Sequence, residues 1–211
     1  MEAYYDQAIG VDFARRVEGL RQLIRKKTFD ENSSTFGIAG NTFRAYIGYN
    51  LPPSEVFREW AQNKTRELFQ EDELEFSTQS SFDLWHTELF KSIKEYWESK
   101  QERDLSFAHT YKLIDLYLKW LLSNSNCPEK LANSILNFGY CALDSKILSM
   151  LNKCLSGALP IRNPTMGDIA NQNTYDFCQA LIKGFAEKHG GTRILFDFYA
   201  WERGGVNKIA G

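Results

Sequence analysis

The sequence contains little that indicates a metal site or a disulfide-bonded secreted fold. Its four cysteines are Cys127, Cys141, Cys154 and Cys178, and no two of them form a CxxC pair. The three histidines do not combine with them at the spacings of zinc sites. We therefore predict no metal ion and no cofactor. We also predict four reduced thiols without disulfide bonds, buried as small apolar side chains.

Signals for export and for membrane insertion are lacking as well. The stretch MEAYYDQAIG has neither the basic start nor the apolar run of a secretory signal peptide. No apolar run approaches the roughly 20 residues that a membrane-spanning helix needs. We expect a cytoplasmic protein without a membrane partner.

An excess of charge of one sign is also absent, because the net charge is −2 and the pI is near 6.0. Proteins that bind nucleic acid over their whole surface are usually more basic. This balance argues against a general DNA-coating role. It leaves room for a local basic patch, which RQLIRKK at 21–27 offers.

What the sequence does contain is helical periodicity. The 211 residues include 43% hydrophobic residues, which is ordinary for a globular protein with a sizeable core. Eight segments combine apolar residues at helical spacing with start or stop signals. They are 11–27, 51–69, 82–101, 106–122, 127–139, 144–157, 173–191 and 192–203. We predict a mainly α fold, as one domain over 1–211 or two helical lobes at about 1–104 and 105–211.

Two local features refine this outline. The glycines and aromatic residues of 35–49 favour a small β-hairpin that turns near Gly40. Before the second helix, Ser54 is a suitable N-terminal cap.

The segment 106–122 is apolar almost all round, which is typical of a central, buried helix. We expect its largest apolar side chains to be deeply buried: Leu113, Leu116, Tyr117, Trp120 and Leu121. Its polar residues Lys112, Asp115 and Lys119 fall on one stripe. The stripe is either a water-facing seam or one wall of a cleft, where desolvation lowers a lysine pKa and makes its amine a nucleophile.

Asp144, in CALDSKILSMLNKC, presents a similar pair of alternatives. It stands where an apolar run meets an amphipathic helix, which is an N-cap position. A capping carboxylate is also fixed at a positively polarised helix end, where it can stabilise a developing cation.

These residues resemble the helix-hairpin-helix DNA glycosylases, of the 8-oxoguanine glycosylase and endonuclease III type, over about 106–154. The stretch KLIDLYLKWL is similar to the helix that carries the nucleophilic lysine, which places Lys112 at that position. The stretch ALDSKIL is similar to the family's aspartate segment, with Asp144 at the aspartate. A competing alignment uses EKLANSILNFG and makes Lys130 the nucleophile.

The sequence also departs from the family pattern. The glycine-rich hairpin before the lysine helix is missing, and Lys146 stands where the family has a histidine. The Lys112 alignment leaves a long gap before Asp144, the Lys130 alignment leaves a short one, and no iron–sulfur cysteine cluster follows.

The resemblance implies DNA as partner and excision of a modified or damaged base from a flipped-out nucleotide by lysine Schiff-base chemistry. Asp144 would stabilise the sugar cation in a cleft shared with Lys112, and Tyr111, Trp85 or Trp201 would stack on the base. Two other functions stay open. One is a non-catalytic helical interaction protein with a protein partner. The other is an enzyme of the same architecture that acts on a modified nucleotide.

Overall fold

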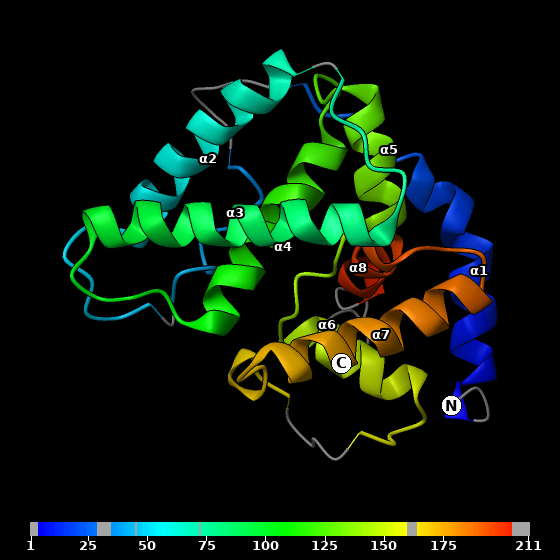
Figure 1. Ribbon diagram of the computed structural model, residues 1–211. Helices are drawn as coiled ribbons and strands as arrows, with labels where there is room; N and C mark the ends of the chain where they lie inside the picture. The colour runs from blue at the N-terminus through cyan, green and yellow to red at the C-terminus, as the bar shows by residue number, and fades with distance from the viewer. Residues whose placement is uncertain (1–3, 29–34, 45, 72, 160–163, 204–211) are drawn as a thin grey trace. The chain divides into compact units, whose positions relative to one another are not determined.

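The computed structural model describes residues 4–28, 35–44, 46–71, 73–159 and 164–203 (Figure 1). Within these ranges the protein is mainly helical, as predicted, with eight α-helices and one short 3₁₀-helix. The chain divides into two compact units. Unit 1 comprises Met1–Leu23 and Tyr140–Gly211, and unit 2 comprises Ile24–Gly139.

Unit 2 contains four helices in sequence order. They are α2 (Pro53–Gln70), α3 (Gln79–Lys100), α4 (Phe107–Ser123) and α5 (Glu129–Phe138). Helix α4 is central, because it packs against both α3 and α5, and α3 also contacts α2 (Figure 1). Residue 104, near which we considered a boundary between two lobes, therefore lies inside unit 2.

Side-chain caps set the starts of the two long helices of unit 2. Thr78 accepts the N–H of Ser81 at the start of α3, and Ser106 accepts the N–H of His109 at the start of α4. These bonds satisfy donors that a helix start otherwise leaves without a partner. Helix α2 begins differently from our expectation: Pro52 is its cap residue and Ser54 lies inside the first turn.

The helix α4 is buried as predicted at Leu113, Tyr117 and Leu121, each with no exposed surface. Leu116 and Trp120, which we also expected to be deeply buried, are partly exposed. The reason lies in the segment before α2, which covers this side of α4 incompletely. The Phe36 ring packs on Trp120 at 4.9 Å, and the backbone of Gly37 approaches that of Leu116.

The polar stripe on α4 also differs from a water-facing seam. Asp115 has no exposed surface, and its Oδ1 lies 2.9 Å from Nε2 of His86 on α3. The imidazole stacks near the rings of Phe82 and Tyr111. Asp115 is therefore part of the α3–α4 core, because a buried carboxylate needs a charged or hydrogen-bonding partner.

The hairpin that we allowed near 35–49 is not present among the described residues there. Consecutive turns replace it, closed by the N–H groups of Ile38, Thr42 and Arg44. The hydroxyl of Thr42 also accepts the N–H of Ala39. The glycines and short polar side chains therefore support turns rather than paired strands.

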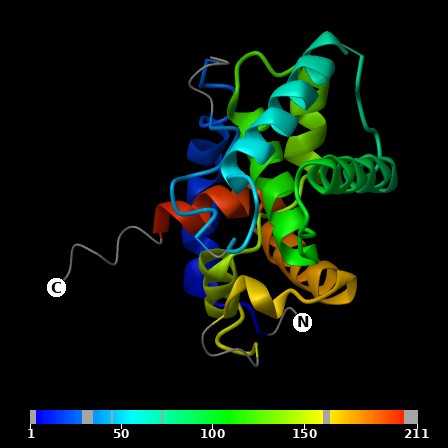
Figure 2. The same ribbon diagram turned by 90° about the vertical axis from the view of Figure 1, so that its left-hand side faces the viewer.

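Unit 1 contains α1 (Gln7–Arg21), α6 (Ser145–Cys154), the 3₁₀-helix η2 (Met166–Asp168), α7 (Gln172–Lys188) and α8 (Arg193–Arg203). Helix α8, predicted as a helix over 192–203, contacts α1, α6 and α7 (Figure 2). Its core side chains meet those of the neighbouring helices in one aromatic cluster. The members of this cluster are Phe13, Phe185, Phe196 and Tyr199.

All four cysteines are buried free thiols. Burial raises the pKa of Cys127 to about 12 and that of Cys178 to about 11, and it also raises the pKa of Cys154 well above its ordinary value. The thiolate is the reactive form of cysteine, so these thiols act as small apolar core side chains.

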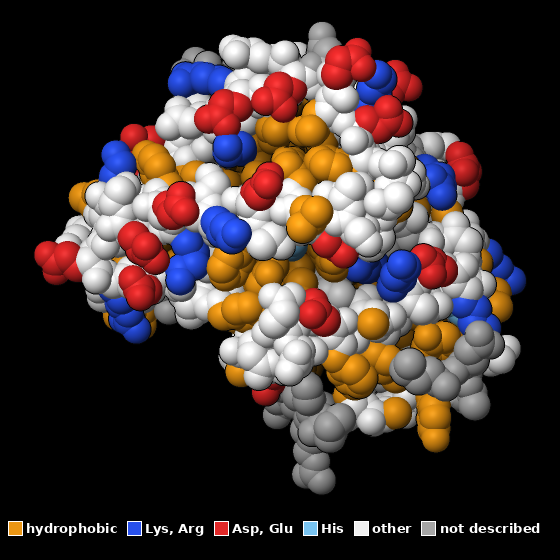
Figure 3. All heavy atoms as spheres, in the orientation of Figure 1, with side chains coloured by type: hydrophobic (Ala, Val, Ile, Leu, Met, Phe, Trp, Pro, Cys, Tyr) orange, Lys and Arg blue, Asp and Glu red, His pale blue; other side chains and the backbone are white. Residues whose placement is uncertain are grey.

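The surface carries charges of both signs. Figure 3 shows lysine and arginine side chains interspersed with aspartate and glutamate side chains on one face. On α3, Lys94 pairs with Glu98. No helix among the described residues has the length and apolar character that crossing a membrane requires.

Candidate nucleic-acid interface

Lys130 lies in the first turn of α5, directly after the short connection 124–128 that follows α4. Its ammonium pairs with the carboxylate of Glu73, from the segment between α2 and α3, and 44% of the side chain is exposed. The hydrogen bond that Lys130 donates to Glu73 raises the pKa of Lys130, and the negative charges of Glu73 and Glu75 add to the effect. The amine is therefore accessible but held in its protonated form by this partner.

Lys112 occupies the second turn of α4 and is partly exposed. Its positive charge acts on His109, one turn earlier. Burial lowers the pKa of His109 to about 4, with smaller contributions from Lys112 and Arg103. The imidazole is thus neutral, packs 3.9 Å from the ring of Tyr46, and accepts or donates at Ser106 through Nδ1.

Asp144 follows the segment 140–143, whose backbone is held in place by side chains of unit 1. The amide of Gln179 donates to the carbonyl of Cys141 and accepts its N–H, at 2.8 and 3.1 Å. The carboxylate of Asp197 accepts the N–H of Ala142 at 2.9 Å. These side chains satisfy buried backbone N–H and C=O groups that lie outside any helix.

The segment ends at the start of α6, where Asp144 is the N-cap, as predicted. Its Oδ1 accepts the N–H groups of Lys146 and Ile147, both at 2.9 Å. The carboxylate is partly exposed. Capping therefore fixes its position and leaves part of it open to solvent, which is compatible with a second, chemical role.

Lys146, in place of the family histidine, lies against Trp201 of α8. Its Nζ sits 3.9 Å from the centroid of the indole ring, within the range of a cation–π contact. One face of Trp201 is thus already covered by a cation, which reduces the ring area that a base could stack on.

The other two aromatic candidates belong to unit 2. Tyr111 is 7% exposed and packs against Phe90 and Phe107, at centroid distances of 4.6 and 4.8 Å. Trp85 is partly exposed and packs against Phe76 at 5.1 Å. Of the two, Trp85 is the more accessible to a ligand.

The predicted residues are divided between the units. Lys112, Lys130, Tyr111 and Trp85 belong to unit 2, whereas Asp144 and Trp201 belong to unit 1. A cleft shared by Lys112 and Asp144 therefore stays a prediction.

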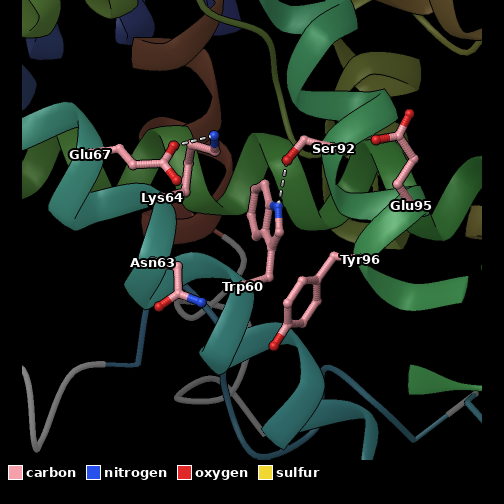
Figure 4. A pocket seen from close by; sticks show the side chains of 7 residues that line it. All are labelled: Trp60, Asn63, Lys64, Glu67, Ser92, Glu95 and Tyr96. Atoms are coloured by element: carbon pink, nitrogen blue, oxygen red, sulfur yellow. Dashed lines mark hydrogen bonds and ion pairs between the residues drawn. The ribbon is translucent and has the colours of Figure 1, made fainter. Parts of the chain in front are cut away.

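A pocket of about 280 Å³ between α2 and α3 was not predicted from the sequence (Figure 4). Trp60 forms its inner wall and donates its indole N–H to Ser92 at 3.1 Å. Its other lining residues are polar or amphipathic: Asn63, Lys64, Glu67, Glu95 and Tyr96. Their spacing on two helices resembles that of ordinary solvated faces, so no sequence signal distinguishes them.

No cluster of three potential metal ligands occurs among the residues whose placement the structure gives. Comparison of the chain with family models, with curated proteins and with solved structures found no match.

Proposed function

We propose that the protein is a DNA glycosylase-like enzyme that excises a modified base through a lysine Schiff base. One observation carries the proposal. Helix α4, a short connection and α5 present Lys130 at a helix start, and the next helix, α6, begins with a capping carboxylate at Asp144. The order, a lysine helix followed by an aspartate that begins another helix, is that of the family described above.

This geometry favours Lys130 over Lys112 as the nucleophile. In the family the lysine opens its helix directly after a hairpin. Lys130 does so in the first turn of α5, whereas Lys112 lies in the second turn of α4. The residues between Lys130 and Asp144 comprise the rest of α5 and the segment 139–143, which has no helical structure.

The chemistry follows from the residue types. The target nucleotide leaves the duplex, and the lysine amine attacks the sugar anomeric carbon while the bond to the base breaks. The electron pair of that bond leaves with the base, which gains a proton. Opening of the sugar ring then gives an imine between lysine and sugar. Asp144 stabilises the positive charge that develops on the sugar.

Glu73 controls the first requirement of this sequence, which is a neutral amine. Its carboxylate is the partner that raises the pKa of Lys130, and it is also the nearest group that can accept the departing proton. Glu73→Gln should therefore lower the pKa of Lys130 and move the pH profile of imine formation towards lower pH. In the Lys112→Ala variant, the rate of imine formation should depend on pH as it does in the wild type.

The proposal is tested by measuring base release from duplexes that each contain one modified base. Asp144→Asn should abolish release but preserve much of the cap, because asparagine is also a good N-cap. Asp6→Asn is the matched control, since Asp6 caps α1 in the same unit through the N–H of Ile9. If Asp144→Asn releases the modified base as fast as Asp6→Asn does, Asp144 has no chemical role.

A second candidate function is a non-catalytic interaction protein that retains the helical architecture. The ion pair of Lys130 with Glu73 favours it, because a lysine that serves only in a surface pair needs no reactive amine. Absence of base release from every duplex, together with wild-type folding, would support this alternative. Release from free modified nucleotides alone would instead support an enzyme acting on nucleotides.

A further inference from the structure

The basic segment Arg25–Lys27 runs alongside the connection between α4 and α5 and is tied to it by backbone bonds. Arg25 N–H donates to Leu122 O at 2.9 Å, Lys27 N–H donates to Ser123 O at 2.9 Å, and Ser125 N–H donates to Lys27 O at 2.8 Å. Lys27 and Asn124 form a parallel bridge. The guanidinium of Arg25 also donates to the carbonyl of Ser125, 100 residues later in the chain. The two segments thus form one small structural element.

The connection itself has no backbone donors left for a ligand. The N–H of Asn124 donates to Leu121 O, and that of Ser125 donates to Lys27 O. The N–H of Asn126 donates to the side chain of Asn124, and that of Cys127 donates to Asn124 O. Pro128 has no N–H. A hairpin that holds phosphate through backbone amides is therefore not available here.

Cationic side chains stand beside this connection instead. Lys26 and Lys27 are exposed, and Arg25 is partly exposed. Arg25 is oriented by the carbonyl of Ser125, at 3.3 Å, and by Glu129, at 3.6 Å. Its φ of +55° lies in the left-handed region, which costs energy for an arginine and is maintained by the surrounding backbone bonds.

The charge balance of this element is positive in a chain whose net charge is −2. Counting only residues that the structure describes, three cations of this element stand beside one carboxylate, Glu129, which pairs with Arg25. Lys26 and Lys27 therefore supply the positive charge that a phosphodiester backbone attracts. Both ammonium groups are exposed, so each is able to contact a phosphate of a nucleic-acid backbone.

We infer that Arg25, Lys26 and Lys27 bind the phosphate backbone of duplex DNA through their side chains, in place of hairpin amides. The choice of duplex DNA as partner rests on the proposed function. The position of the contact rests on the backbone bonds and charges of unit 2 alone.

Binding is measured with an undamaged labelled duplex and the Asp144→Asn protein, so that base release does not enter. Lys26→Gln/Lys27→Gln should weaken binding by about tenfold or more at low salt. It should also reduce the slope of log K against log salt concentration by about 0.9 for each lost phosphate contact. The control Arg58→Gln/Lys91→Gln removes two exposed charges elsewhere in unit 2 and should change binding less than twofold.

Equal binding by the two double variants would overturn the inference, as would undetectable duplex binding by the parent protein. Stronger competition by single-stranded RNA than by duplex DNA would overturn the choice of partner. Thermal unfolding of each variant shows whether it folds, and Lys26→Arg/Lys27→Arg should retain tight binding.

Loss of DNA binding in Lys26→Gln/Lys27→Gln, without any base release by the wild type, would refute the proposed function and uphold the inference. Base release by the wild type, together with unchanged DNA binding by Lys26→Gln/Lys27→Gln, would uphold the proposed function and refute the inference.

Discussion

Removing Asp115 should destabilise unit 2 more than removing a buried apolar side chain of similar size. The carboxylate has no exposed surface, and its partner His86 is 3% exposed. Asp115→Ala removes an acceptor that lies 2.9 Å from Nε2 of His86 and leaves that nitrogen in the core without this bond. Breaking a buried pair of this kind costs about 3–5 kcal/mol.

Two further variants separate the lost partner from the lost volume. Asp115→Asn keeps a carbonyl acceptor for the imidazole N–H and should cost only about 1–2 kcal/mol. His86→Phe/Asp115→Leu removes both polar groups while filling much of the same space. Its free energy of unfolding should be within about 1 kcal/mol of the wild-type value, because apolar replacement of a buried pair often changes stability little.

The assay is urea unfolding followed by tryptophan fluorescence. Four of the five tryptophans, Trp60, Trp85, Trp97 and Trp120, belong to unit 2, so the signal reports mainly on the unit that contains the pair. If Asp115→Ala loses less than about 1 kcal/mol, or the double variant is less stable than Asp115→Ala, the buried pair does not hold α3 against α4 in the way described.

Three further predictions concern the packing and ionisation of other groups. Gly37→Ala should cost about 2 kcal/mol or more in urea unfolding, because φ is +89° and an added Cβ would lie 2.2 Å from the carbonyl oxygen of Leu116; Gly40→Ala, in open space, should be near neutral. The pKa of His109, lowered to about 4 by burial, means that its contribution to stability is complete above the unfolded value of about 6.5 and is lost as the pH falls towards 4. His109→Phe should flatten that part of the pH–stability profile, and an unchanged slope between pH 7 and 5 would contradict the assignment. Finally, the four buried thiols should react with an aromatic disulfide reagent only after denaturation, and rapid reaction of any of them in the native protein would show that its burial is incomplete.

Helical periodicity and caps were sufficient to predict much of the fold. The eight predicted segments correspond to the eight helices of the described residues, and Asp144 caps α6 as expected. These features depend on residues close together in the sequence, so local patterns contain them. The absence of strands among the described residues of 35–49 was harder to foresee, because glycine and aromatic residues favour turns and hairpins alike.

The sequence could not show which polar residues pair across the fold. Asp115 looked like part of a solvated stripe because its partner, His86, lies on another helix and no local spacing connects the two. The same limit applies to the bonds between Arg25–Lys27 and the α4–α5 connection, which join residues far apart in the chain. It also applies to Glu73, whose contact changes the ionisation of Lys130.

The most direct test of the proposed lysine chemistry is borohydride reduction during incubation with duplexes that contain single modified bases. Reduction converts an imine between lysine and sugar into a stable covalent adduct, and mass spectrometry of the digested protein identifies the modified lysine. We predict an adduct at Lys130 that disappears in Lys130→Ala and persists in Lys112→Ala. No adduct with any modified duplex, or an adduct that survives both substitutions, would contradict the account.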